Sequence, residues 1–255
     1  MDLSILILSI LPVYLLNRYI NSKDSEKEPK ELLKKLTKGG IYAALLTIII
    51  SLFLPLISPT LDATRTKVMN PVELLIYAFV GVALVEESCK YYFVHKYTYN
   101  NREFDYLFDM IVYATYVSLG FALLENLIYV ITGGIYVGLL RAITAIPMHA
   151  CTGVMMGHFL GEAKYNEINK KSAKKNKILA LLVPILMHGA YDYSALSGHT
   201  LVFIILIITF IYISIDLVNK KSRNDIKIQR KYDYCPKCGT KIVGNFCTNC
   251  GKKAE

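Results

Sequence analysis

Two adjacent glutamates stand inside an apolar stretch long enough to cross a bilayer. The stretch runs from Leu74 to Val94 and contains Glu86, Glu87 and then Lys90. An ionisable group at mid-membrane costs about 2.5 to 3.5 kcal/mol even by low estimates, so the pair should face a protein interior or a water-filled cavity. On a helix Lys90 reaches both carboxylates and can neutralise one. The sequence predicts a buried polar site with one free carboxylate; a purely structural Glu–Lys pair is the alternative.

Further polar residues occur in three other apolar stretches. Glu125 and His149 stand in separate stretches, and His188 lies four residues before Asp192 in a third. Residues four apart share one helical face, which is the spacing by which a helix offers two ligands to one metal ion. Each residue also has a structural reading: an interhelical hydrogen bond for Glu125, a core position for His149, and an intrahelical pair for His188 and Asp192.

Depth along the helices indicates which of these residues share a level in the membrane. At about 1.5 Å per residue, Glu86 and His188 lie roughly 15 Å from the inner face, and His149 and Asp192 roughly 20 Å. Glu125 comes out at roughly 27 Å, which places it at the outer rim. Because three stretches agree, we expect one polar site built from several helices.

The composition indicates the fold that must position this site. Of 255 residues, 54% are hydrophobic, and apolar stretches recur along the chain. We predict an all-α polytopic membrane protein with about seven transmembrane helices, each near the ~20 residues that a span requires. The predicted spans are Leu3 to Ile20, Ile41 to Ile57, Val72 to His95, Leu107 to Ile131, Ile135 to Leu160, Ile178 to Leu196 and Leu201 to Val218.

The formal net charge of +9 is distributed in alternate loops. Lysines and arginines follow the first, third, fifth and seventh predicted spans, whereas the intervening connections hold only Arg65 and Lys67. This bias places the N-terminus outside and the C-terminus in the cytoplasm of an integral cell-membrane protein. It explains the charge better than nucleic-acid binding does. Since Asp2 replaces a basic start and no small-residue cleavage site follows, we expect the first span to be a retained anchor.

The C-terminal region carries a separate metal motif. Two Cys-x-x-Cys pairs are separated by eight residues, and a glycine follows the second cysteine of each pair. This spacing is typical of a structural zinc ribbon, and a reducing cytoplasm favours zinc over disulfides. We expect a transmembrane bundle over residues 1–220 with its core at about 72–196, a linker at 221–231 and the ribbon at 232–255. The isolated Cys89 and Cys151 are expected to be packing residues, and the predicted zinc ligands are Cys235, Cys238, Cys247 and Cys250.

The polar motifs, taken in order, resemble the PrsW family of intramembrane proteases. The resemblance rests on Val85 to Lys90, Phe121 to Asn126, Pro147 to His149 with Gly153, and His188 to Asp192. It implies a membrane-embedded, metal-dependent endopeptidase that cuts membrane-anchored regulators such as anti-sigma factors. By position, the resemblance assigns the paired glutamates, the acid of the second motif and the later polar positions to Glu86, Glu87, Glu125, His149, His188 and Asp192.

Peptide hydrolysis requires water, a base and positive charge for the developing oxyanion. We expect His149 and His188 to hold a catalytic zinc ion, with Asp192 as third ligand or as partner of a histidine. One glutamate, with a preference for Glu86, then acts as general base on the metal-bound water, while the other pairs with Lys90. A metal-free glutamate–histidine mechanism stays open.

Two other functions fit the same residues. A non-catalytic scaffold or substrate-binding subunit would use the polar residues for helix packing, and a proton- or metal-coupled transporter would use them as an ion path. No pair of similarly interrupted helices in two halves of the chain supports the transporter. The expected partners are a membrane-anchored protein substrate, the lipid bilayer and a cytoplasmic protein bound by the ribbon.

Overall fold

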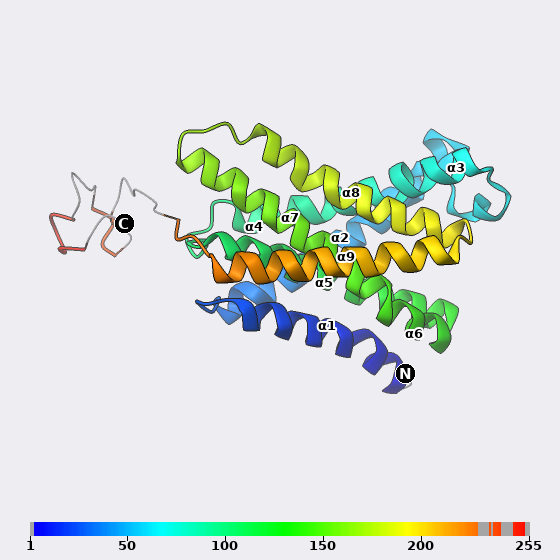
Figure 1. Cartoon of the computed structure of the whole chain (residues 1–255), viewed down its shortest axis with the longest axis horizontal. Helices are drawn as coiled ribbons and strands as arrows, with labels where there is room; N and C mark the ends of the chain where they lie inside the picture. Colours follow the sequence, from blue (N-terminus) through cyan, green and yellow to red (C-terminus); the bar gives the residue numbers. More distant parts are fainter. Residues whose placement is uncertain (1–2, 229–234, 236, 241–246, 253–255) are drawn as a thin grey trace.

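A computed structural model of the chain describes residues 3–228, 235, 237–240 and 247–252 (Figure 1). The described residues form a bundle of long helices joined by short connections. The elements are α1 (Leu3–Lys23), α2 (Lys30–Ile57), η1 (Pro59–Leu61), η2 (Ala63–Val68), α3 (Pro71–Ile76), η3 (Tyr77–Ala83), α4 (Leu84–Thr98), α5 (Leu107–Gly133), α6 (Ile135–Ile143), α7 (Ala145–Ile168), α8 (Lys174–Leu196) and α9 (Thr200–Arg223).

Five helical stretches in the described part are long and apolar enough to cross a membrane. They are α2, α5, α6 together with α7, α8, and α9. The α1 helix and the run from α3 to α4 are not among them, so the expected number of about seven spans stays a prediction. The all-helical membrane architecture itself is confirmed, because the described chain is helical throughout its apolar stretches.

Helix α5 is the centre of the bundle. In its most apolar window 83% of the residues are buried inside the protein, against 17% for α9, and it packs against α1, α2 and α7 (Figure 1). A helix with apolar residues on every side suits this position, whereas the outer helices turn large apolar side chains towards lipid. Since α5 contacts so many neighbours, it fixes the positions of the helices that carry the polar residues.

Glycines permit the closest helix contacts on α5. A Cβ atom on Gly157 of α7 would lie 2.4 Å from the Met110 carbonyl oxygen, and one on Gly153 would meet Ser118 at 2.9 Å. On the other side, a Cβ on Gly120 would lie 2.3 Å from the Thr37 carbonyl oxygen of α2. No larger residue fits there without moving backbone. The close contact expected from the four-residue spacing of the α7 glycines is therefore present.

The predicted span from Ile135 to Leu160 lies within one membrane-span candidate, Ile135–Ile168, but it is not one regular helix. It is broken at Thr144, where α6 ends and α7 begins with changed backbone angles. The reason lies in Pro147, which has no N–H to donate to the Ile143 carbonyl and whose ring would crowd that turn. The break lets α6 leave the line of α7 (Figure 1).

The helix that carries the paired glutamates is also irregular. Between α3 and α4, the η3 segment is a π-helix, and the Leu84 N–H donates to the Phe79 carbonyl five residues earlier. Each such turn holds an extra residue, and π-helical turns occur frequently at functional sites. The widened turns end at Ala83, three residues before Glu86.

Candidate functional site

The predicted polar residues of α4, α7 and α8 converge in the interior of the bundle. Glu86 and Glu87 are 6% and 0% exposed, and His149 and His188 are 3% exposed each. The two imidazole rings stand edge to face, with centroids 5.2 Å apart. The structure thus brings together residues 102 positions apart in sequence, Glu86 and His188, whose side chains share one buried polar cluster.

Lys90 connects the members of this cluster. Its ammonium group is fully buried and donates to Glu87 Oε1 at 2.7 Å, whereas Glu86 Oε2 is farther away at 3.4 Å. It also lies 2.9 Å from His149 Nδ1 and 4.1 Å from the centre of the Phe121 ring. Since a buried ammonium group must donate its protons, His149 Nδ1 accepts one of them.

Glu125 lies closer to the cluster than its expected place at the outer rim. Its Oε2 atom is 2.7 Å from His149 Nε2, and the Arg141 guanidinium reaches the same oxygen at 2.7 Å. The break at Thr144 separates the turn that carries Arg141 from the turn that carries His149, and both side chains reach Glu125. The His149 ring is therefore held from both sides, by Lys90 and by Glu125.

His188 is held by carboxylates as well. Its Nδ1 lies 2.8 Å from Glu87 Oε1, while Nε2 faces Asp192 Oδ2 at 3.3 Å and Glu86 Oε2 at 3.8 Å. If Nδ1–H donates to Glu87, Nε2 carries a lone pair that can bind a metal ion, as in the carboxylate–histidine pairs of metal sites. Asp192 Oδ2 is buried and has no hydrogen-bond partner, although it lies beside this nitrogen.

These donors fit a metal ion. Ligand atoms of Glu86, His149 and His188 all lie within 4.8 Å of one another. Two imidazoles and a carboxylate are a common donor set of catalytic zinc. The buried Asp192 Oδ2 accepts no hydrogen bond and lies 3.3 Å from His188 Nε2, so it is a further oxygen donor at the same place. The structure thus puts Glu86, rather than Asp192, in the trio of converging donors. Metal binding by His149 would require it to give up its contact with Lys90 or with Glu125.

A cavity of about 550 Å³ gives access to the cluster. Glu86 and Glu125 line it, together with Tyr77 and Tyr129, and the short helices after α2 form part of its wall. Glu87, Lys90 and both histidines are not among its lining residues. Of the residues in the site, water in this cavity can therefore reach Glu86 and Glu125.

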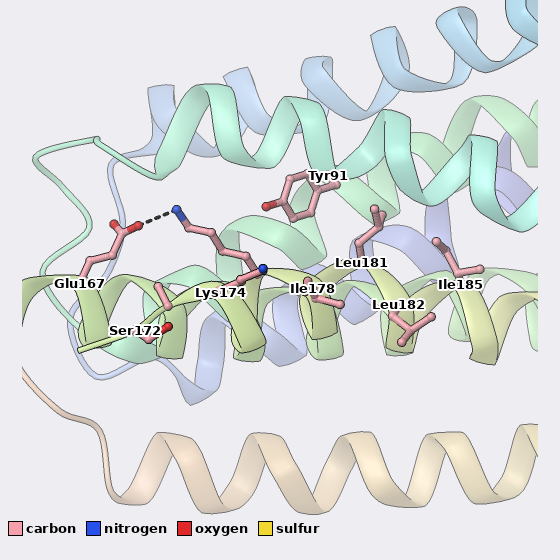
Figure 2. Close-up of a pocket in the computed structure, with 10 residues that line it drawn as sticks. Tyr91, Glu167, Ser172, Lys174, Ile178, Leu181, Leu182 and Ile185 are labelled. Carbon is pink, nitrogen blue, oxygen red and sulfur yellow. Dashed lines mark ion pairs between the residues drawn. The ribbon is translucent and has the colours of Figure 1, made fainter. Parts of the chain in front are cut away.

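A second and larger hollow lies away from the cluster. This groove, of about 810 Å³, runs between α4 and the first half of α8, with Tyr91 on one side and Ile178 to Ile185 on the other (Figure 2). An ion pair between Lys177 and Glu167, at 2.5 Å, closes one end (Figure 2). The groove contains no residue of the polar cluster, so its size does not make it the reaction site.

The four predicted ribbon cysteines form a second group of metal donors. Their Sγ atoms all lie within 4.8 Å of one another. The two halves repeat one backbone pattern, in which the glycine N–H donates to the carbonyl of the first cysteine, from Gly239 to Cys235 and from Gly251 to Cys247. Both glycines have a φ of +71°, a conformation that suits glycine. Four thiols at this spacing fit a structural metal site.

Sequence reasoning left some members of the site without a role. Arg141, a charge inside an apolar stretch, received no role, and Phe121 entered only as part of a motif. An arginine in such a stretch needs a buried acid as partner, which is the signal that would have paired it with Glu125. Cys89 and Cys151 are buried among apolar side chains, as expected of packing residues.

Fold and site together define a protease embedded in the membrane, and the comparisons with known proteins agree. Residues 28–215, more than half of the chain, match the PrsW family of intramembrane metalloproteases, and the chain belongs to this family. It is 39% identical over 202 residues to "Protease PrsW" of Oceanobacillus iheyensis, covering 78% of this chain and 87% of the relative. It is 30% identical over 236 residues to "Protease PrsW" of Clostridioides difficile, covering 89% and 95%. No solved structure shows significant similarity to the chain.

Proposed function

We propose that this intramembrane protease cuts membrane-anchored regulatory proteins, with Glu86 as the general base. The observation that carries this proposal is the position of Glu86, which belongs to the converging donors and also lines the cavity. A general base must lie within reach of the water from which it takes a proton. Among the cluster residues on α4, only Glu86 lines this cavity.

We assign the proton transfers to Glu86 and positioning roles to its neighbours. Glu86 takes the proton of the attacking water and returns it to the leaving amine, so both steps occur at one carboxylate. Glu87 is engaged by Lys90 and His188 and holds both in place. Arg141, through Glu125, keeps His149 oriented. Lys90 and Arg141 are each paired with a carboxylate, so the positive charge that stabilises the negative oxygen developing on the attacked carbonyl would come from a bound metal ion.

Zinc is the metal that these donors would suit best. Glu86, His149 and His188 would hold it, with Asp192 beside His188, and it would supply Lewis-acid polarisation at the scissile carbonyl. If Glu86 is a ligand, the proton transfer falls to its second oxygen or to Glu125, the other acid that lines the cavity. A second, structural zinc is proposed for the four cysteines.

The orientation in the membrane is also a proposal. The described lysine-rich segments, at the ends of α1, α7 and α9 and at the start of α8, gather at one end of the bundle (Figure 1). By the positive-inside bias this end is cytoplasmic. A green fluorescent protein fused after Glu255 should fluoresce, and a periplasmic phosphatase fused there should be inactive. The reverse pattern would overturn the orientation. A cytoplasmic protein partner of the ribbon stays a prediction.

New N-termini in membranes test the substrate class. Membranes from cells that produce the wild type or Glu86→Gln should be labelled at free N-termini and compared. We expect termini specific to the wild type in proteins with one membrane anchor, at or near the anchor. Equal sets of termini would contradict the proposal, provided that both proteins are present in equal amounts.

A further inference from the structure

Five carboxylates gather at the lysine-rich end of the bundle, away from the polar cluster: Asp109 lies in the first turn of α5, about 24 Å along the helix from Glu125. We call this group the inner acidic cluster. It joins the loop between α1 and α2, the loop before α5, the first turn of α5 and the segment after α9. Its members are Asp24, Glu28, Asp105, Asp109 and Asp225.

Three of these carboxylates are removed from water. Asp24, Glu28 and Asp109 are 4%, 7% and 1% exposed. Glu28 accepts a hydrogen bond from Tyr113 Oη at 2.7 Å and contacts the Asp109 carboxyl group. Two carboxyl groups in contact require a proton or a cation between or beside them. Burial, the larger cause, and the other acids raise the pKa of Glu28 to about 7.

Several oxygens of the cluster have no partner. Both carboxylate oxygens of Asp24 are buried with no hydrogen-bond partner at ordinary distance, although the Glu26 backbone N–H lies near, and Oδ2 of Asp225 is likewise buried without a partner. The Asp109 carboxyl group has the Glu28 carboxyl group beside it. Lys27, whose charge acts on Asp24, does not donate to these oxygens, because its Nζ donates to the backbone carbonyls of Asn21 and Asp24. Buried acceptors without a donor are costly, and a bound ion is one common explanation.

The same place anchors the segment that leads to the cysteines. Ile226 accepts from the Leu107 N–H at 3.0 Å, and Ile228 donates to the Asp105 carbonyl at 2.6 Å. Asp225 Oδ1 accepts from the Phe108 N–H at 3.0 Å. The segment after α9 therefore lies against the start of α5, the central helix, with the buried acids beneath it.

We propose that the inner acidic cluster binds a hard divalent cation, Mg²⁺ or Ca²⁺, which fastens the segment after α9 to the start of α5. Carboxylate, phenol and carbonyl oxygens are the donors that these cations prefer, and the cluster offers no thiol or imidazole. In the described structure no three of its acids bring oxygens within 4.8 Å of one another. The cation therefore draws the repelling carboxylates inward, and water completes its shell.

Terbium luminescence tests this proposal on the purified full-length chain in neutral detergent. Tb³⁺ is a hard oxygen-seeking cation that nearby tyrosine sensitises, and the chain contains 19 tyrosines and no tryptophan. We expect sensitised emission that Ca²⁺ or Mg²⁺ displaces, and the two competition curves decide between these ions. Asp24→Asn should weaken Tb³⁺ binding about tenfold or more. The control Asp216→Asn, an exposed acid on α9, should leave it unchanged.

Two further measurements distinguish this cation site from the polar cluster and from a folding defect of the variant. Glu86→Gln should retain the signal, since the polar cluster in the membrane is a separate place. If Asp24→Asn does not fold, the wild type is heated with Mg²⁺, with Ca²⁺ and with K⁺ at equal ionic strength, and the divalent ions alone should raise the melting temperature. Emission that neither Ca²⁺ nor Mg²⁺ displaces, or that Asp24→Asn leaves unchanged, would overturn the proposal. None of these readouts depends on proteolysis.

Discussion

Glu86 and Glu87 are neighbours in sequence but have different surroundings in the bundle. Glu87 is fully buried and held by Lys90 and His188, whereas Glu86 reaches the cavity and lies 3.4 Å from Lys90. A carboxylate bound on both sides is suited to positioning, and one that meets water is suited to proton transfer. The two glutamates should therefore respond differently to the same substitution.

Glu86→Gln should abolish most proteolysis and leave the fold intact. Loss of a general base costs about 10² to 10⁴ in rate, and the Lys90–Glu87 pair survives. Glu87→Gln leaves the buried ammonium group with a poorer partner, so the free energy of unfolding should fall by about 3 kcal/mol or more. Cleavage of a membrane substrate and melting in detergent measure the two effects. Full activity in Glu86→Gln would remove it from the mechanism.

At the scale of the elements, close contact between α5 and its neighbours decides where the polar residues stand. His149 lies one turn before Gly153 and two turns before Gly157 on the face of α7 that touches α5. If α7 moves away from α5, His149 moves away from Glu125 and Lys90. Helix packing and the site geometry are thus coupled through small residues.

Gly157→Ala should therefore damage both stability and activity. The added Cβ would lie 2.4 Å from the Met110 carbonyl, and backbone cannot yield as a side chain can. Overpacking of this kind costs about 1–3 kcal/mol. The matched control is Gly161→Ala, one turn farther along α7, where the nearest atom is the Leu107 carbonyl at 3.1 Å. Melting curves of both variants should rank them in that order; equal effects would contradict the close contact.

At the scale of the whole molecule, there are two groups of metal donors in the described residues, for which we propose different roles. The buried trio of Glu86, His149 and His188 lies next to the cavity, and the four cysteines follow the transmembrane bundle in sequence. Catalytic zinc is typically held by three protein ligands such as glutamate and histidine, which leaves one coordination position for water or substrate. Four thiolates fill all four positions, as in structural zinc sites. The two sites should be separable by substitution.

Metal analysis of purified protein tests this separation. We expect about two zinc ions per chain in the wild type and about one after Cys247→Ser with Cys250→Ser. His149→Ala with His188→Ala should remove the other ion and leave the cysteine site loaded. If all zinc leaves with the cysteines, and added zinc does not bind to the core, a metal-free mechanism based on Glu86 replaces the proposed one.

The sequence by itself determined the chemistry and the class of fold. Polar residues such as Glu86, His149 and His188 inside apolar stretches are costly enough in lipid to mark a site wherever the helices place them. The cysteine spacing is equally local, because the two short knuckles form from adjacent residues. Apolar stretches of about twenty residues then indicated a helical membrane protein.

Only the tertiary structure decided which of these residues meet. Glu125 of α5 contacts His149 of α7 and Arg141 of α6, and Glu86 of α4 faces His188 of α8, which no single stretch of sequence shows. Periodicity along one helix carries no information about rotation and tilt against its neighbours. These are set by close contacts such as that of Gly157 with α5, which form between residues distant in sequence.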